Sequence, residues 1–563
     1  MFWKRICCVI LLGMTTVRAQ DCVDGLCELL ASHRLPELRW PDFTEYAEPI
    51  ERFYRSGGYR LKWFADGRAA PQALSLIAIL KDSETKGLDA EDYDASRWPA
   101  RLKEVANGTT SEKLEIADLA LTVCVMRYVS DLHFGRLKPG IFNSRSGTAE
   151  EPFDLSEQLR QLANGIDPQR FLTELEPPFP GYQRARRALA IYLDLRKSIG
   201  KSDHQPISAP KLPIEPNSSF PDAARLAALL YRLGDLPDTA QQPAGRYEGS
   251  LVEAVRRFQE RHGLDMDGRI GRETLVELNT PIEQRIKQLE LALERWRWAP
   301  HNFSRPPIVV NIPEFRLRAF DANYNAELEM NIVAGRAVRN QTPVFAASLS
   351  YLTFRPYWHV PISIVRKELL PAIARDASWL SKHRYEVVNL KGEVVTTGSP
   401  DQATLAGLHS GKFRLRQLPG ERNSLGLIAF MFPNEHSVYM HATPATMFFD
   451  RSRRDFSHGC IRLEHPVELA EWVLKDEPAW TRQRIVDAMQ GSRTLRLDLK
   501  RPVPVLIVYA TAVALSNGKV HFFRDIYGDD AALESQLAKR YRRSAAPVPV
   551  RPNSASGQRY FSN

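Results

Sequence analysis

The sequence has little cysteine: six residues among 563, two of which, Cys7 and Cys8, fall in an apolar stretch at the start. So few thiols exclude a small fold held together by disulfides. After the first twenty residues no apolar run is long and uncharged enough to cross a bilayer. There is also no block of Lys and Arg with interleaved aromatic residues, so the net charge of +9 does not indicate nucleic-acid binding. A modest positive balance suits a polyanionic partner of another kind.

Residues 1–19 predict a signal peptide, because a short basic region with Lys4 and Arg5 precedes an apolar stretch and a small-residue cleavage pattern. The sequence therefore predicts export, with no stable membrane span after processing. In an oxidising compartment Cys22 and Cys27 could close a small loop. Cys124 lies in an apolar run and is expected to be a buried, inert thiol. Cys460 is left unpaired, which calls for an explanation.

The hydrophobic periodicity changes along the chain and predicts a multidomain α+β protein. An N-terminal helical scaffold is expected over residues 40–205, ending in a Pro/Ser-rich linker. A small three-helix module follows at 215–280, and a mainly-β domain at 300–530. A charge-rich, more helical stretch at 361–412 is expected to be a lid inserted into that domain. The tail at 544–563 is expected to be disordered.

The strongest chemical signal is the segment Ser457–Arg462, preceded by His441 at the end of a predicted strand. A thiolate is the reactive form of cysteine, and a nearby imidazole can take the thiol proton. Alternation along the strand places Tyr439 and His441 on one face, so the imidazole can reach a cleft that Tyr439 helps to line. Gly459 permits a sharp turn, and the backbone amides around it could stabilise an oxyanion.

A metal site is the sharper alternative, because His441, His458 and Cys460 have donor types that zinc accepts. No paired CxxC or HxxxH motif accompanies them, and no acidic residue nearby could act as general base. We therefore predict no metal ligands and no cofactor. Arg462 is expected to add positive charge beside the thiol or toward a substrate carboxylate.

These motifs, in this order, resemble the YcbB-like branch of the L,D-transpeptidases, which combine a YkuD-type catalytic domain with a peptidoglycan-binding module. His441 and Cys460 within Ser-His-Gly-Cys-Ile-Arg resemble the catalytic signature, and residues 254–275 resemble the module. Further similar segments lie in the predicted helical scaffold and in the predicted mainly-β domain: Phe53–Trp63, Gly87–Tyr93, Asn311–Leu317, Gln341–Phe345, Pro356–Pro361, Leu415–Gly420 and Phe432–Asn434. The resemblance covers most of residues 45–530.

The resemblance implies an exported enzyme of the periplasm or cell wall that acts on peptidoglycan stem peptides and glycan strands, with cell-wall synthases as possible partners. Cys460 would be the nucleophile, His441 the general base and acid, and Gly459 part of the oxyanion site. The expected substrate-binding residues are Tyr439, Ser457, His458, Arg462 and Trp358. Cys460 would attack a tetrapeptide stem, expel D-Ala and form a 3→3 cross-link through a thioester, and carbapenems would label the thiol.

Relatives often carry Asp directly after the catalytic histidine, whereas this chain has Ala442, so which group orients His441 is left open, and a backbone carbonyl is expected to suffice. Two other functions remain open. A carboxypeptidase or hydrolase would use the same residues with water as acceptor, and a wall-binding scaffold would use none of them. The small helical module could grip glycan or only pack on the catalytic domain.

Overall fold

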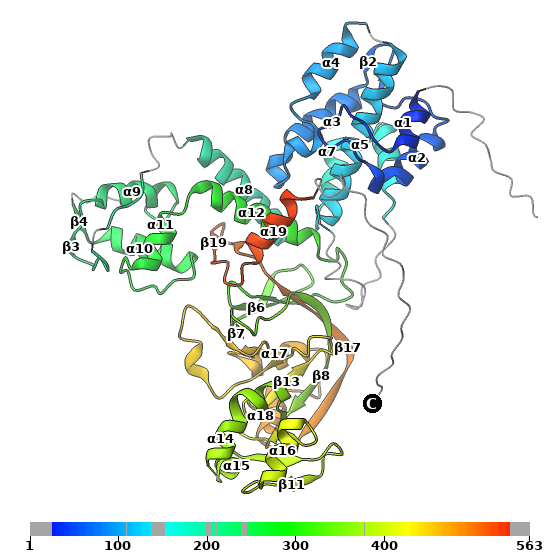
Figure 1. The fold of residues 1–563 in the computed structure, drawn as a ribbon. Coiled ribbons are helices and arrows are strands. Elements are labelled where there is room, and N and C mark those ends of the chain that lie inside the picture. The colour runs from blue at the N-terminus through cyan, green and yellow to red at the C-terminus, as the bar shows by residue number, and fades with distance from the viewer. Residues whose placement is uncertain are drawn as a thin grey trace, which may run out of the picture.

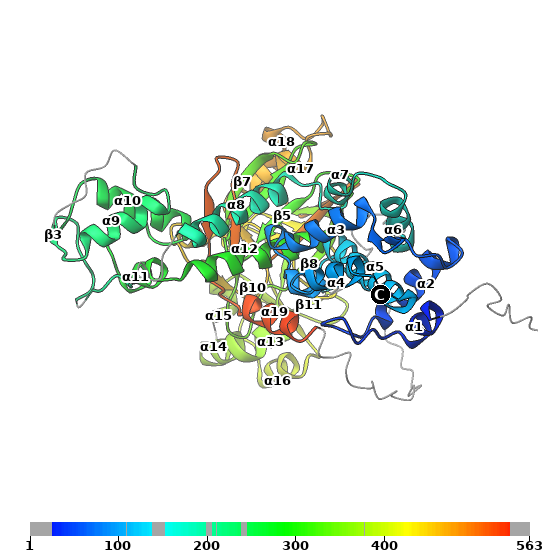
Figure 2. The ribbon, with the colours of Figure 1, turned by 90° about the horizontal axis from the view of Figure 1, so that it is seen from above.

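The computed structural model describes residues 25–108, 110–137, 153–198, 205–209, 211–237, 245–376 and 378–540. Figure 1 shows three regions: helices from the N-terminal part at the upper right, a small helical module at the left, and a mainly-β domain with its insertion at the bottom. The view from above in Figure 2 places the module and the N-terminal helices on opposite sides of the β domain. The expected multidomain α+β architecture is confirmed.

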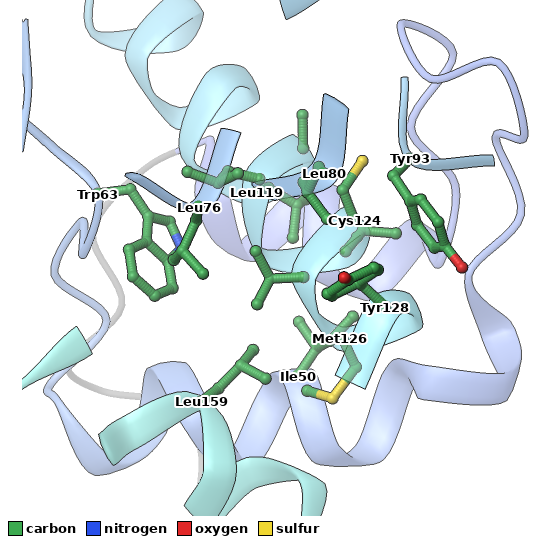
Figure 3. Packing of buried hydrophobic residues seen from close by; sticks show 14 of the residues in the cluster. Ile50, Trp63, Leu76, Leu80, Tyr93, Leu119, Cys124, Met126, Tyr128 and Leu159 are labelled. Carbon is green, nitrogen blue, oxygen red and sulfur yellow. The ribbon is translucent and has the colours of Figure 1, made fainter. Parts of the chain in front are cut away.

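The N-terminal region is built around one helix, α5, that is buried on almost all sides. Its apolar run from Leu119 to Leu132 packs against side chains from the surrounding helices, as Figure 3 shows for Leu76, Leu80 and Leu159. Cys124 belongs to this core, and burial raises the pKa of its thiol to about 12, as expected for an inert cysteine. The elements are α1 (Leu26–Ser32), η1 (Thr44–Tyr46), α2 (Ala47–Ser56), β1 (Phe64–Ala65), β2 (Arg68–Ala69), α3 (Pro71–Lys81), η2 (Ser83–Lys86), η3 (Ala90–Tyr93), α4 (Trp98–Ala106), α5 (Ser111–Phe134), α6 (Leu155–Ala163) and α7 (Pro168–Glu174).

A buried carboxylate on α5 ties a loop of this region to its core. One oxygen of Asp118 accepts backbone N–H groups from Lys62 and Trp63 at 2.8 and 2.7 Å, and from Phe64 at 3.2 Å. Its other oxygen accepts the hydroxyl of Tyr54 at 2.7 Å. These bonds partly offset the burial that raises the pKa of Asp118 to about 6. The carboxylate therefore satisfies three amides that would otherwise be buried without partners.

Two long helices connect the three regions. An apolar stripe on α12 (Ile282–Arg297) packs on α8 (Pro180–Ser198) and on the hairpin of β18 (Ala512–Ala514) and β19 (Val520–Phe522). Arg540, just after α19 (Asp529–Ala538), forms an ion pair with Asp131 of α5. The module itself has the three expected helices, with their own core: β3 (Ser218–Ser219), α9 (Ala223–Arg232), β4 (Arg246–Tyr247), α10 (Ser250–Arg261) and α11 (Arg272–Leu278).

The β domain is a nine-stranded sheet in the order β15-β7-β16-β14-β13-β8-β17-β5-β6. An additional pairing of β6 with β7 closes the sheet into a barrel around an apolar core. A closed barrel leaves few unpaired edges, which fixes the strands that carry the site. The strands are β5 (Ile308–Asn311), β6 (Arg316–Phe320), β7 (Ala326–Gly335), β8 (Phe345–Phe354), β13 (Ile428–Met431), β14 (Met440–His441), β15 (Asp455–Ser457), β16 (Ile461–Leu463) and β17 (Leu495–Val508). Helices α17 (Pro466–Val473) and α18 (Arg482–Gln490) connect β16 to β17.

The insertion between β8 and β13 is more mixed than the helical lid expected at 361–412. It contains a four-stranded sheet in the order β11-β10-β12-β9 as well as helices, and it has its own apolar core. The strands were missed because they are short and lie among Lys, Glu and Gly residues, although all four residues of β10 are buried. The elements are β9 (Trp358–His359), α13 (Ile362–Ile364), the π-helical turn η5 (Val365–Leu369), α14 (Leu370–Arg375), α15 (Trp379–Lys382), β10 (Tyr385–Val388), β11 (Val394–Thr396), α16 (Gln402–Ser410) and β12 (Arg414–Gln417).

Two predictions concern the ends of the chain. The signal peptide at 1–19 and the tail at 544–563 lie outside the described residues, as does Cys22. Cys27 is disulfide-bonded. Within the ranges that the structure describes, no helix combines the length and apolar character that crossing a membrane requires.

Replacing Asp118 with Ala should destabilise the N-terminal region by about 3 kcal/mol, because three buried backbone amides lose their acceptor. The first thermal unfolding transition should fall, and hydrogen exchange at residues 62–64 should accelerate. Glu104→Ala, an exposed acid on the neighbouring α4, is the matched control. Equal exchange in both variants would show that the loop is held by other contacts.

Candidate active site

The parallel pairing of β14 with β16 brings the two predicted catalytic side chains together. Met440 pairs with Ile461 and His441 with Arg462. In the same register, Cys460 lies opposite Tyr439, one position earlier on each strand. The N–H of Ile461 donates to the carbonyl of Tyr439 at 3.1 Å, which extends the pairing by one residue. Paired residues of neighbouring strands point to the same face. His441 and Cys460 are therefore diagonal neighbours on one face, while Met440 points into the core.

A backbone carbonyl orients the imidazole of His441, as expected from the absence of an Asp after it. Nδ1 lies 2.6 Å from the carbonyl oxygen of Ala442, which can only accept, so Nδ1 carries the proton. The neutral ring then has Nε2 available as a base. Burial, together with the charge of Arg462, lowers the pKa of His441 to about 4, while the carbonyl groups of Ala442 and Leu425 act in the opposite direction. The imidazole is therefore neutral near pH 7.

The thiol of Cys460 is also in its neutral form. Burial raises its pKa above the ordinary value, while the backbone N–H and hydroxyl of Tyr439 and the charge of Arg462 act in the opposite direction. The sulfur lies 3.9 Å from the carbonyl oxygen of Ser437. Among the contacts of the described residues, none joins the thiol directly to the His441 ring. The resting site thus holds a neutral thiol and a neutral imidazole.

The loop before the nucleophile is folded by Ser457. Gly459 has φ +114°, a conformation that favours glycine. Its N–H donates to Oγ of Ser457 at 3.0 Å, and that hydroxyl donates to the carbonyl of Cys460 at 2.5 Å. The Gly459 N–H is therefore not free to bind an oxyanion in this structure, contrary to the expectation, because the serine hydroxyl occupies it. Ser457 itself, expected to contact substrate, is buried and shapes the loop.

A buried threonine from a distant segment braces the same loop. Oγ1 of Thr342 donates to the carbonyl of Gly459 at 2.8 Å and accepts the N–H of Gly335 at 2.9 Å. The hydroxyl of Tyr527 donates to the carbonyl of Gly335. Sequence reasoning quoted the segment around Thr342 for its resemblance only and gave the residue no role. The only signal in the sequence for this contact was the pair Thr342-Pro343, and such a pair does not indicate which residue the threonine contacts.

Two arginines near the catalytic loop, Arg462 and Arg336, have no carboxylate partner among the described residues. Arg462 follows Cys460 on the same face, and its Nε is buried without a hydrogen-bond partner. Burial lowers its pKa, and the nearby charge of Arg336 lowers it further. Arg336 is exposed and donates its backbone N–H to the carbonyl of Ser457. Sequence reasoning identified Arg462 but missed Arg336. The charge of Arg462 acts on the thiol directly, whereas that of Arg336 acts on Arg462.

The inserted domain contacts the catalytic loop through His458. Nε2 of His458 lies 2.7 Å from Oε1 of Glu368 in η5 of the insertion. Trp358, expected to bind substrate, lies in the sheet of the insertion, where it pairs with Gln417 and packs on Tyr385. None of its described contacts reaches the catalytic loop. Across the described part of the chain, no group of three or more His, Cys, Asp or Glu residues is arranged to hold a metal ion.

The neutral state of the site predicts how Cys460 reacts with iodoacetamide. Since burial holds the thiol pKa above its ordinary value of about 8.5, less than about 3% is thiolate at pH 7. The alkylation rate should rise about tenfold per pH unit from pH 6 to 8. Mass spectrometry of the labelled peptide measures the rate, and Cys460→Ala serves as the control for labelling elsewhere. A plateau starting near pH 5 would instead indicate a thiolate–imidazolium pair in the resting protein.

The brace predicts that Thr342→Val loosens the loop around Gly459. Loss of two hydrogen bonds of about 1 kcal/mol each should increase amide exchange in residues 457–462 by about 10-fold or more. Thr342→Ser retains the hydroxyl and should stay within about threefold of the natural protein. If the valine and serine variants exchange alike, the hydroxyl does not hold the loop.

Comparison with known families agrees with this division of the chain. Residues 305–503 match the L,D-transpeptidase catalytic domain, residues 221–278 match a "Putative peptidoglycan binding domain", and residues 48–189 match the scaffold domain. The first match contains the barrel, the insertion and both His441 and Cys460. The ranges predicted from the sequence are 300–530 for the mainly-β domain, 215–280 for the small helical module and 40–205 for the helical scaffold.

A relative from Haemophilus influenzae, described as a "Putative L,D-transpeptidase", is 30% identical over 317 residues. The matched region is 54% of this chain and 63% of the relative, so the chain spans less than two thirds of that protein's length. An L,D-transpeptidase crystal structure from Xylanimonas cellulosilytica is 16% identical, with 54% of this chain and 99% of that chain covered and a TM-score of 0.19, too low to support a conclusion. The matching families nevertheless identify the chain as one that carries a YkuD-type L,D-transpeptidase catalytic domain together with a scaffold domain and a peptidoglycan-binding domain.

Proposed function

We propose that this protein is an L,D-transpeptidase that forms 3→3 cross-links in peptidoglycan through a thioester on Cys460. The observation that supports this most is the register of β14 and β16, which aligns Cys460 with His441 on one face. The hydrogen bond from His441 Nδ1 to Ala442 leaves Nε2 as the base. Acyl transfer between stem peptides needs a nucleophile and a base held near the polymer. This chain combines a free thiol, an imidazole of fixed tautomer and a peptidoglycan-binding domain.

In the first half-reaction the donor is a tetrapeptide stem. The sulfur of Cys460 attacks the carbonyl of the third residue, usually diaminopimelate, while its proton passes to Nε2 of His441. The amide C–N bond then breaks, and the imidazolium returns the proton to the amine of the leaving D-Ala. Arg462 and Arg336, which have no carboxylate partner among the described residues, suit the carboxylate of the donor stem. The N–H of Cys460 is a better oxyanion donor than that of Gly459, which Ser457 engages.

In the second half-reaction the side-chain amine of another stem attacks the thioester. A new amide bond forms, the C–S bond breaks and the sulfur regains a proton, which restores the thiol. If water attacks instead, the same residues give a carboxypeptidase. The insertion can influence the choice between amine and water as acceptor, because its residue Glu368 contacts the catalytic loop. We propose that the insertion is the lid expected from the sequence.

The peptidoglycan-binding domain would bring the barrel to its polymer in the periplasm or cell wall. The module lies against the β domain: Arg524, after β19, forms ion pairs with Glu273 and Glu277 of α11. Between the two lies a cavity of about 360 Å³, with charged residues of both signs in its walls. A fixed position next to this cavity is compatible with both packing and glycan binding. Cell-wall synthases remain possible partners.

The purified protein incubated with defined tetrapeptide muropeptides should release D-Ala and give 3→3 dimers. Cys460→Ala should lower both products by at least about 1,000-fold, because Cys124, the other free thiol among the described residues, is buried in the N-terminal core. Mass spectrometry of the products and of a carbapenem adduct on Cys460 measures the outcome.

Each alternative function gives a different result in the same assay. Tripeptide without dimer would identify a carboxypeptidase. A scaffold would release no D-Ala and take up no carbapenem. Full activity of the Cys460→Ala variant would contradict the proposed nucleophile.

A further inference from the structure

A second cavity lies between the outer face of the barrel and the helices α8 and α12. Side chains alternate along a strand, so a strand that sends Ile308 into the barrel core sends its next residue outward. The outward residues of three strands meet the two helices around a cavity of about 310 Å³. The barrel wall of this cavity includes Val309 of β5, Phe320 of β6 and Val508 of β17. Among the described residues, none of 455–463 lines it, so it is separate from the catalytic loop.

The helical wall of the cavity is aromatic. Phe179, directly before α8, packs on Trp296 of α12 with ring centroids 5.7 Å apart. The same ring packs on Phe303 and Tyr324, at 5.9 and 5.1 Å. All four rings line the cavity. Binding sites for small molecules are typically about 300–1,000 Å³ in volume and are lined by apolar and aromatic side chains with a few polar groups. The size and the walls of this cavity therefore favour a ligand with an apolar body.

A guanidinium group in the same wall lacks an opposite charge. Nε of Arg184, on α8, donates to the carbonyl of Ala514 at 3.0 Å. Its two terminal nitrogens form no hydrogen bond with a described residue, and no described carboxylate pairs with them. Burial lowers the pKa of Arg184, and the charges of Arg187 and Arg318 lower it further. The charged group is thus partly desolvated among like charges, where an anion would be stabilised.

The other charged side chains of the wall are paired. Arg295 forms an ion pair with a carboxylate of α19. Arg318 forms ion pairs with Glu314 and Glu329. Within the described part of the wall, Arg184 is therefore the charged side chain without a partner. A ligand that complements this wall has to carry an anionic group.

We propose that this cavity binds a small amphiphilic anion, whose apolar body packs on the aromatic wall and whose anionic group binds Arg184. The apolar body gains free energy by leaving water, and charge-assisted hydrogen bonds to the guanidinium fix its orientation. Because the barrel, α8 and α12 share the walls, an occupied cavity holds these helices against the barrel. The inference does not depend on the proposed transpeptidase activity, since it concerns a different part of the chain.

Isothermal titration of the full-length protein with decanoate tests the proposal. Decanol and decyltrimethylammonium serve as the neutral and the cationic probe with the same chain, and decyl phosphate distinguishes a phosphate from a carboxylate group. Arg184→Gln removes the unpaired charge, and Arg187→Gln, which changes an exposed arginine of α8 outside the cavity, is the matched control. Val508→Trp fills the cavity from the barrel wall, and Ala510→Trp fills it from the loop after β17 if the first variant does not fold.

We expect one anion to bind per protein, with a Kd at least about 10-fold lower than that of the cationic probe. Arg184→Gln should weaken binding of the anion about 10-fold and change binding of decanol less than about twofold, since a charge-assisted hydrogen bond is lost. Arg187→Gln should bind as the natural protein does, and the tryptophan variants should lose binding.

The proposal is wrong if neither decanoate nor decyl phosphate binds, or if the cationic probe binds equally well. Binding that persists in a folded tryptophan variant would place the ligand elsewhere on the protein and would also overturn it. An equal loss in Arg184→Gln and Arg187→Gln would have the same consequence, because it would reflect the overall charge of α8 and not a contact in the cavity.

Discussion

The site depends on one constraint, the parallel pairing of two very short strands. β14 and β16 are 2 and 3 residues long, and a slip of one residue would turn Cys460 or His441 to the opposite face. The neighbouring strands prevent this. β13 holds β14 on one side, and β7 holds β16 on the other, within a barrel that closes on itself. Met440 and Ile461 anchor the register because both are fully buried in the core.

The same burial sets the charge state of the reacting groups. In a desolvated site both the thiolate and the imidazolium are disfavoured, which raises one pKa and lowers the other. The hydroxyl of Tyr439 and the charge of Arg462 favour the thiolate, but they do not outweigh burial. Reactivity therefore has to come from a bound substrate, whose carbonyl accepts the developing charge. A nucleophile that stays neutral until then is protected from oxidation and from other electrophiles.

Local pattern was sufficient to predict the two central residues and the fold class, because strand alternation and a compact motif are short-range signals. The residues that support them could not be predicted in this way. Thr342 lies 117 positions from Gly459, and Glu368 lies 90 positions from His458. Only the closed barrel and the insertion bring these pairs together. Trp358 lies in the sheet of the insertion, which its sequence did not indicate, and its contact with substrate stays a prediction.

The two imidazoles of the loop region differ in what holds them. His441 is fixed by the carbonyl of the next residue, so its tautomer is set within the barrel. His458 is fixed by Glu368, which belongs to an insertion with its own core and with a π-helical turn, a feature often found at functional sites. The orientation of His441 is thus independent of the insertion, whereas that of His458 is not. It follows that a displacement of the insertion would release the His458 side chain while leaving the His441 ring held by the barrel.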